Sequence, residues 1–385
     1  MKNNTVPIAS LLTVLLIGAA VLTVTPVGAV QGPGTVTVPD DYQRIQDAVN
    51  AANLGDTIIV KEGIYNEDYI TLDKPVYLFG ENQKSVIIYH SSLGFVIRAN
   101  DVHLAGFTIT SNEHGQGHAV DLANSRGCII EGNLIENNLV GISVYGSSSG
   151  NTVSRNVLSK NERSIELIDA SSNTISYNNI TGALVSGISL DVSSDNTVYG
   201  NRISDLVDGM GALMLWKSSN NVISRNYLLG GNPMLMIECS GNILTENHVK
   251  DSDYGMVVGA SSGNNIYGNY FINITQQQVL DTKENGQLSE NSWDNGKEGN
   301  YWSSYNGLDN NANGIGDSPY FLYDKNQDKY PLMDSPSNSP NNTAESPKTS
   351  SAGLSLPTEA VIGVVIVLAV IIITVATMKL KKTNV

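Results

Sequence analysis

The chain has 385 residues, of which 41% are hydrophobic and 15% are charged, and its net charge is -15 at pH 7. This composition excludes a disordered protein, because enough apolar residues are present to bury a sizeable core. The acidic balance also excludes nucleic acid and anionic lipid as expected partners, because both repel a negatively charged surface.

Residues 1–29 are typical of a secretory signal peptide. Lys2 supplies the positive end, residues 8–24 are apolar, and Val27-Gly28-Ala29 offers small residues for cleavage. An uncleaved N-terminal anchor is the alternative interpretation. Both predict that the bulk of the chain is exported.

Residues 30–64 are predicted to form an N-terminal cap and the first coil of a solenoid. Residues 42–52 have the spacing of a short amphipathic helix, and Asp40 or Asp41 is placed to cap its N-terminus. Such a helix would cover the apolar end that a solenoid leaves open. Strands are expected at 57–60, 76–79 and 86–89.

Between residues 124 and 281 one short phrase recurs, as in NTVSRNVL at 151–158 and NTISYNNI at 173–180. Its second Asn falls at 133, 156, 178, 201, 226, 247 and 269, a period of roughly 22 residues that is typical of a solenoid. Each repeat holds short runs with period two, which indicate strands rather than helices. Val153 and Leu158, Ile142 and Val144, and their counterparts in the other repeats would then form inward columns. Stacked about 4.8 Å apart, these columns predict a parallel β-helix over residues 65–290.

The Asn column is predicted to lie at the corners of the coils. Asn tolerates a left-handed backbone, and its amide can bond the equivalent amide in the next coil. Cys128 and Cys239 lie about five coils apart, beyond the reach of a disulfide. We therefore expect two separate small core or corner residues.

The stretch IQDAVNAANLGDTIIVKEGIYNEDYITLDKPVYLFGEN at 45–82, followed by the NTVSRNVL-type repeats, resembles the pectate-lyase-like superfamily. It is most similar to the NosD-type branch, periplasmic copper-processing proteins with carbohydrate-binding and sugar-hydrolysis repeats that many archaeal surface proteins share. The resemblance covers about residues 36 to 334. It implies an all-β, single-stranded, right-handed parallel β-helix, and the handedness comes from the resemblance alone. It also suggests an accessory role in the maturation of a copper enzyme.

The outward side of one strand column carries a candidate ligand-binding site. If Ile142 and Val144 point inward, Tyr145 points outward, and its stacked counterparts are Ile168, Asp191, Trp216 and Ile237. Contiguous apolar side chains on a surface often mark a binding site. We expect Trp216 and Tyr145 to stack on sugar rings and Asp191 and Glu166 to bond sugar hydroxyls. The alternative is that a loop or the C-terminal segment covers this face.

Two enzyme classes remain as alternatives. A glycoside hydrolase needs two carboxylates facing one groove, and the candidates on adjacent coils are Glu166, Asp169, Asp191 and Asp195. A polysaccharide lyase needs Ca²⁺ beside a Lys or Arg base. The candidate arginines have no cluster of Asp around them; they are Arg155, Arg202 and Arg225.

Copper requires His, Met or Cys ligands close together. Met234, Met236 and Met256 fall in an inward column, where thioethers fill a core. Among the five histidines, which are 90, 103, 114, 118 and 248, only His114 and His118 are close in sequence. Their spacing outside a helix does not indicate a copper site, so copper is not expected.

Residues 291–334 are predicted to form a C-terminal cap that contains a Ca²⁺-binding loop. Oxygen ligands recur at alternating positions, namely Asp309, Asn311, Asn313, the Ile315 carbonyl and Asp317, with Gly314 at the sharp turn. The pattern departs from an EF-hand-like loop at position twelve, which is Tyr320, so Asp324 or Asp328 would have to complete the shell. A polar turn that binds nothing is the alternative. The aromatic residues of this segment are expected to pack over the last coil.

The remaining residues predict attachment to a membrane. Residues 335–359 are rich in Ser, Pro, Asn and Thr, which indicates a disordered linker. Residues 360–378 are apolar over the length of a transmembrane helix, and the lysines of the tail 379–385 place that tail in the cytoplasm. Sequons at Asn179, Asn273 and Asn341 offer glycan acceptors. The sequence thus predicts a membrane-anchored extracellular β-helix protein that binds polysaccharide or glycoconjugate.

Overall fold

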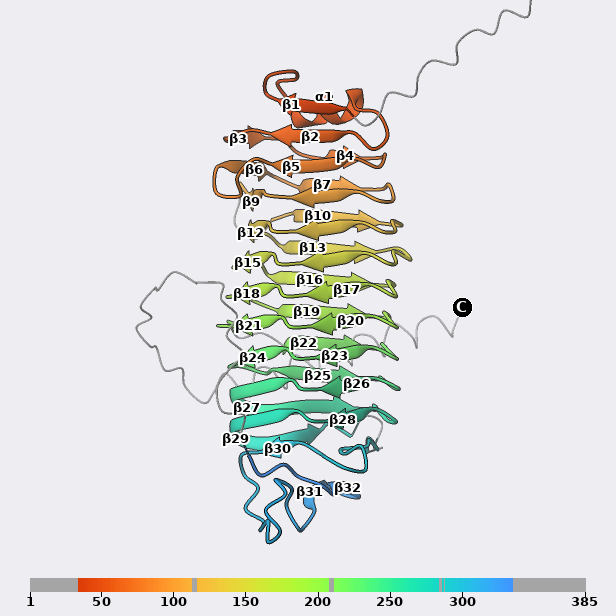
Figure 1. Ribbon diagram of the computed structural model, residues 1–385, viewed down its shortest axis with the longest axis vertical. Coiled ribbons are helices and arrows are strands. Elements are labelled where there is room, and N and C mark those ends of the chain that lie inside the picture. The colour runs from red at the N-terminus through yellow and green to blue at the C-terminus, as the bar shows by residue number, and fades with distance from the viewer. Residues whose placement is uncertain (1–33, 113–115, 208–210, 284–285, 287, 335–385) are drawn as a thin grey trace, which may run out of the picture.

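The computed structural model describes residues 34–112, 116–207, 211–283, 286 and 288–334. Strands stack like rungs along one axis, with a short helix at one end and a small hairpin at the other (Figure 1). The described chain is therefore an all-β parallel solenoid with very little helix, as predicted.

One side of the solenoid is an 11-stranded sheet to which each coil contributes one short strand. All its neighbours pair in parallel and in register. Its strands are β1 (Thr35–Val38), β2 (Thr57–Val60), β5 (Tyr77–Gly80), β8 (His103–Ala105), β11 (Ile129–Glu131), β14 (Thr152–Ser154), β17 (Thr174–Ser176), β20 (Thr197–Tyr199), β23 (Val222–Ser224), β26 (Ile243–Thr245) and β28 (Asn265–Tyr267).

The rest of the wall is a 19-stranded parallel sheet with two strand columns. The first column holds β3 (Gly63–Asn66), β6 (Val86–His90), β9 (Thr108–Ser111), β12 (Leu134–Glu136), β15 (Val157–Ser159), β18 (Asn179–Thr181), β21 (Arg202–Ser204) and β24 (Tyr227–Leu229). The second holds β4 (Ile70–Leu72), β7 (Leu93–Ile97), β10 (His118–Ala123), β13 (Val140–Tyr145), β16 (Arg163–Ile168), β19 (Ser186–Asp191), β22 (Gly211–Trp216) and β25 (Met234–Ile237). Two long strands, β27 (His248–Gly259) and β29 (Tyr270–Asp281), pair with both columns, and β30 (Tyr301–Trp302) pairs with β29.

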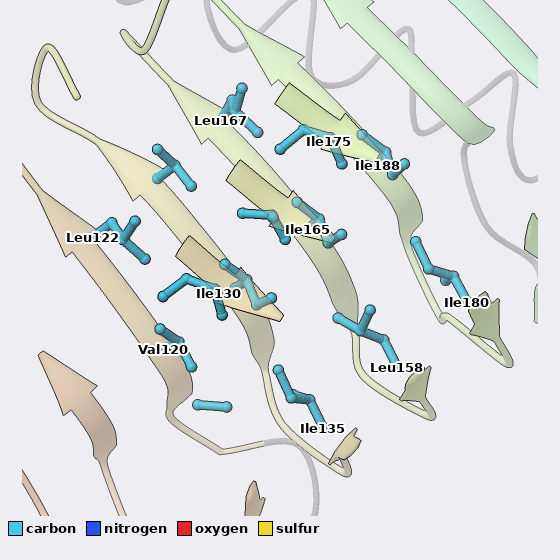
Figure 2. Packing of buried hydrophobic residues seen from close by; sticks show 14 of the residues in the cluster. Val120, Leu122, Ile130, Ile135, Leu158, Ile165, Leu167, Ile175, Ile180 and Ile188 are labelled. Carbon is cyan, nitrogen blue, oxygen red and sulfur yellow. The ribbon is translucent and has the colours of Figure 1, made fainter. Parts of the chain in front are cut away.

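The predicted inward columns form the core. Val153, Leu158, Ile142 and Val144 are fully buried, and their counterparts in the following coils are at most 2% exposed. Figure 2 shows aliphatic side chains of this core stacked coil upon coil, among them Ile135, Leu158 and Ile180. Burial of each large aliphatic side chain stabilises the fold by about 1.5–3 kcal/mol, so the repeat itself supplies the core.

The repeated Asn column forms a buried amide ladder. The Asn201 side-chain oxygen accepts hydrogen bonds from the Asn178 backbone N–H (2.9 Å) and side-chain amide (3.0 Å). The same pattern joins Asn133, Asn156, Asn178, Asn201, Asn226, Asn247, Asn269 and Asn300. A second ladder runs through Asn151, Asn173, Asn196, Asn221, Asn242, Asn264 and Asn291. The predicted bonding between coils is confirmed.

The left-handed backbone predicted for the Asn column was assigned to the wrong residue. The residue before each Asn of the first ladder from Asn133 to Asn269 has positive φ, as at Arg155 (54°), Tyr177 (55°) and Gly200 (65°). Asn156, Asn178 and Asn201 do not. The left-handed residue makes the corner, and this leaves the next Asn free to turn its amide into the ladder.

Helix α1 (Ile45–Ala51) packs on the first coil, as predicted, but its predicted cap is wrong. The N-cap residue Arg44 makes no capping bond. Instead, Glu67 from the first coil accepts hydrogen bonds from the Ile45 (2.8 Å) and Gln46 (3.2 Å) N–H groups. A carboxylate at a helix N-terminus is favourable because the N–H groups there lack partners within the helix.

The aromatic residues of the C-terminal segment close the other end of the solenoid. Trp293 and Trp302 are each 1% exposed, and Trp302 stacks on Phe271 of β29 at 4.5 Å and 4°. A terminal hairpin follows, formed by β31 (Tyr320–Tyr323) and β32 (Asn326–Asp328). Its Tyr320 ring also stacks on Trp302, with the ring centres 5.3 Å apart. The predicted packing is confirmed for these residues, whereas Phe321 is 71% exposed.

The cysteines are separate buried corner residues, as predicted. Cys128 and Cys239 are both free, and they precede strands β11 and β26, which lie five steps apart in one sheet. The Cys128 N–H donates to Asn151, whereas the Cys239 N–H donates to Ser261. Burial raises the pKa of the Cys239 thiol to about 11, so it stays protonated at neutral pH.

Several predicted segments lie outside the described residues. They are the signal peptide 1–29, the linker 335–359, the transmembrane helix 360–378 and the tail 379–385. Within the described ranges, no helix has both the length and the hydropathy needed to cross a bilayer.

Candidate functional site

The predicted binding residues share one surface, the outward side of β10, β13, β16, β19, β22 and β25, which we call the Trp216 face. In-register pairing places five residues in its outer column, namely Tyr145, Ile168, Asp191, Trp216 and Ile237. Ile168 is 42% exposed and Trp216 is 41% exposed. The alternative that a loop or the C-terminal segment covers this face is therefore wrong at Ile168 and Trp216.

A second outward column runs beside the first on the same strands. It contains Asp121, Ser143, Glu166, Ser189, Met214 and Leu235. Although these side chains face outward, Asp121 is only 5% exposed, Ser143 2% and Glu166 9%. The Ser143 hydroxyl donates to Glu166 Oε1 at 2.9 Å. The polar residues of this second column are thus much more enclosed than Ile168 and Trp216 of the outer column.

Sequence reasoning missed two polar residues of this face. His118 Nδ1 lies 2.8 Å from Asp121 Oδ1. The hydrogen bond with Asp121 raises the pKa of His118 above its usual value, and the charge of Glu166 acts in the same direction. Asp121 could have been found in the sequence, because it lies one repeat before Ser143. The position of His118 depends on a break in the inward–outward alternation after the first residue of the strand, where Ala119 and Val120 are both buried.

The distances along the outer column limit what one ligand unit can touch. Trp216 lies one coil from Asp191 and three coils from Tyr145, so about 14 Å of stacking separates the two aromatic residues. They cannot contact the same sugar ring. The Lys217 ammonium lies 5.8 Å from the centre of the Trp216 ring, and burial raises the pKa of the neighbouring Asp191.

The structure separates the four candidate hydrolase carboxylates. Glu166 and Asp191 lie on the Trp216 face, on adjacent coils and two residues apart along the strand, which places their backbones about 8 Å apart. Asp169 and Asp195 have positive φ and are exposed in turns beyond the strands. Only the first pair shares a surface on which a ligand could lie.

The candidate lyase arginines lie elsewhere and are engaged. Arg155 pairs with Glu131 (3.3 Å), Arg225 pairs with Glu246 (2.6 Å), and Arg202 lies 4.8 Å from the centre of the Tyr227 ring. None of them belongs to the strands of the Trp216 face. Their arrangement does not suit a lyase base.

The predicted Ca²⁺ loop turns its oxygens onto its own backbone. Asp309 accepts from the Asn313 (3.1 Å) and Gly314 (2.8 Å) N–H groups, and Asn313 accepts from the Ile315 N–H (2.9 Å). Asn311 accepts from the Asn313 N–H, and Asp317 accepts from the backbone and side chain of Asn310. Asp328 is fully buried and accepts from Asn300 and Trp302, so it is not available to complete the shell.

The described residues do not fit a copper site. They contain no group of three or more His, Cys, Asp or Glu residues that could hold a metal. Met234, Met236 and Met256 are at most 2% exposed in the core. His118 is bonded to Asp121, and the predicted partner His114 lies outside the described residues.

Comparison with known proteins gives a family match over more than half of the chain. The model of the family described as "Periplasmic copper-binding protein (NosD)" matches residues 49–240 and 214–307. A cell surface glycoprotein of Methanothermus fervidus is 32% identical over 131 residues, covering 24% of this chain and 21% of that protein. A probable ABC transporter binding protein NosD of Stutzerimonas stutzeri is 38% identical over 105 residues, covering 25% of this chain and 23% of that protein. The chain thus spans between a fifth and a quarter of the curated relatives it matches.

Solved structures with a similar outline include polysaccharide-degrading enzymes. The catalytic domain of a GH87 α-1,3-glucanase in complex with nigerose has a TM-score of 0.49 and 13% identity, covering 68% of this chain and 57% of that one. An alginate lyase from Paenibacillus sp. str. FPU-7 has a TM-score of 0.40 and 11% identity, covering 68% and 99% respectively. Nothing about the activity of this chain follows from these likenesses.

Proposed function

This chain belongs to the NosD family, and on that premise we propose that it is a cell-surface or envelope protein that binds a polysaccharide or glycoconjugate without cleaving it. The observation that carries the proposal is Trp216, a large aromatic side chain that is 41% exposed at the C-terminal end of strand β22. Asp191 lies beside it on the preceding coil.

The chemistry of these neighbours suits a sugar. An exposed indole offers a flat apolar surface to the C–H face of a sugar ring, and a neighbouring carboxylate accepts hydrogen bonds from its hydroxyl groups. Ile168 and Ile237 extend the apolar surface along the outer column. Because the coils repeat about every 4.8 Å, a linear polymer lying along the solenoid axis would meet successive rungs.

The proposed binding is tested on the exported part, residues 30–334, with a glycan array. Wild type is expected to bind at least one glycan class, and Trp216→Ala is expected to abolish that signal. Phe321→Ala is the matched control, because Phe321 is an exposed aromatic residue on the terminal hairpin. If no glycan binds, or if Trp216→Ala binds as wild type does, the proposal is refuted.

The same samples test the enzymatic alternatives. Hydrolysis would release new reducing ends, and a lyase would release unsaturated products. Either product from wild type, lost in Glu166→Gln, would replace the binding function with a catalytic one.

We also propose that residues 360–378 anchor the protein in a membrane after export directed by residues 1–29. The proposal follows from the apolar length of the segment and the lysines behind it. In a cell fractionation, the full chain should sediment with membranes, and a chain ending at residue 359 should be released. Equal distribution of the two chains would contradict the anchor.

We further propose that the loop 309–317 binds Ca²⁺ and stabilises the C-terminal cap. The support is its two carboxylates and the alternating oxygen side chains. A thermal melt with added Ca²⁺ should show a higher midpoint than one with chelator, and Asp309→Asn should remove the difference. Equal midpoints for the wild type would end the proposal.

A further inference from the structure

Glu166 is a nearly buried carboxylate on the Trp216 face that forms no direct ion pair, although its charge acts on the nearby His118. It is 9% exposed and faces outward in the second outward column, beside Ser143. Its Oε1 accepts a hydrogen bond from the Ser143 hydroxyl, but its Oε2 accepts none from the described residues. Glu166 also forms no ion pair with any described residue.

The cations on this face are already engaged with other carboxylates. His118 is 2.8 Å from Asp121, Arg163 is 3.6 Å from Glu162, and Lys217 is 3.7 Å from Glu238. The two carboxylates that remain without an ion pair are Glu166 and Asp191, on adjacent coils. Glu166 and Asp191 therefore lack a direct ion pair with the described residues, and only the longer-range charges of His118 and Lys217 act on them.

A carboxylate in this position is costly unless something compensates it. Removing a charge from water is unfavourable, and one bond from a neutral hydroxyl offsets only part of that cost. A ligand ammonium would provide a charge-assisted hydrogen bond to Oε2 and neutralise the charge. A ligand carboxylate at the same place would add like-charge repulsion in a poorly solvated site.

We infer that the Trp216 face takes a glycan with free amino groups, a polymer of hexosamine units, and not a polymer of uronic acids. An ammonium group binds at Glu166, Asp191 accepts a second polar contact, and an apolar sugar face packs on Trp216. Glu166 and Trp216 are two coils apart, which is about 10 Å of stacking. The ligand must therefore be longer than one sugar unit. This inference rests on the proposed function.

The inference is tested by calorimetry on the full-length chain in detergent and mildly acidic buffer. Four hexasaccharide probes are compared, namely the hexamers of glucosamine, of N-acetylglucosamine, of glucose (cellohexaose) and of galacturonate. The glucosamine oligomer should bind most tightly and the galacturonate oligomer most weakly. Glu166→Gln keeps the shape and the bond with Ser143, and it should weaken glucosamine binding by about tenfold or more while leaving cellohexaose unchanged.

A matched variant controls for general attraction between a cationic oligomer and an acidic protein. Glu62→Gln changes the net charge by the same amount at an exposed residue beside the N-terminal cap and should leave all four affinities unchanged. If Glu166→Gln does not fold, the more exposed Asp191→Asn serves the same test and should also lower glucosamine affinity.

Each remaining outcome decides between the two proposals. Galacturonate binding as tight as glucosamine, a glucosamine preference that survives Glu166→Gln and Asp191→Asn, or an equal loss in Glu62→Gln overturns the amino-glycan inference. In those cases binding to Trp216 still stands if Trp216→Ala abolishes it. If no oligomer binds wild type, the amino-glycan inference fails, and the glycan array alone decides the proposed function. If Trp216→Ala binds every oligomer as wild type does, the proposed function itself fails.

Discussion

Replacement of one amide in the Asn ladder should destabilise the solenoid far more than its size suggests. In Asn201→Ala, the Asn178 backbone N–H and side-chain amide lose their acceptor, and the Ile175 carbonyl and the Asn226 side chain each lose a donor. Asn201 is 1% exposed, so water does not easily replace these bonds. An unsatisfied buried N–H costs about 1–3 kcal/mol, and each further lost bond costs about 1 kcal/mol. With three further bonds lost, we expect the free energy of unfolding to fall by about 4–6 kcal/mol.

Urea denaturation of residues 30–334 measures this change from the transition midpoint and slope. Asn306→Ala is the control, because Asn306 is exposed and makes no hydrogen bond among the described residues; it should change stability by less than about 0.5 kcal/mol. Asn201→Asp separates hydrogen bonding from volume. It keeps the size but turns a carboxylate oxygen toward the Ile175 carbonyl, so it should destabilise at neutral pH and recover partly in acid.

If Asn201→Ala costs no more than Asn306→Ala, the ladder does not stabilise the coils, and the reasoning is wrong. If Asn201→Asp is as stable as wild type at neutral pH, the direction assigned to the amide is wrong.

Two further predictions concern a corner and the C-terminal cap. Gly200→Ala should destabilise more than Gly132→Ala: both glycines have positive φ, but a Cβ at Gly200 would lie 2.7 Å from the Tyr177 ring, whereas Gly132 has open space. Equal transition midpoints would show that the Tyr177 ring moves aside freely. Burial raises the pKa of Asp328 to about 6 from 3.8, so ionisation is less favourable in the folded state. Its contribution to stability should be fully present below about pH 4 and lost as pH rises through 6, by about 3 kcal/mol. Asp328→Asn should abolish this part of the pH dependence in thermal melts, and an unchanged difference between pH 4 and pH 7 would contradict the assignment.

The fold could be predicted because the same aliphatic positions recur in every repeat of the sequence. Val153, Ile175 and Val198 recur at one position of successive repeats, and side chains that alternate along a strand must then stack in one inward column. Repeated Asn residues likewise stack on the equivalent Asn of the next coil and form hydrogen bonds with it. The outward order from Tyr145 to Trp216 follows from the same register.

Departures from simple alternation within a strand had to come from the tertiary structure. His118 and Asp121 are three residues apart, and simple alternation would place them on opposite faces. Ala119 and Val120 are both fully buried, so the alternation breaks at the start of β10 and both polar side chains face outward. The same break recurs at Ser164-Ile165 and Ala212-Leu213, which are at most 1% exposed, so it belongs to every repeat but does not follow period two.

The sequence by itself determined the repeat, the inward columns, the amide ladders and the column that contains Trp216, because all of these depend on local period and register. Only the tertiary structure decided which outward carboxylate is enclosed and which is exposed. It also showed that Glu67 rather than Asp40 or Asp41 caps helix α1. These features depend on neighbours from other coils, and no local pattern encodes the solvation that those neighbours leave to a side chain.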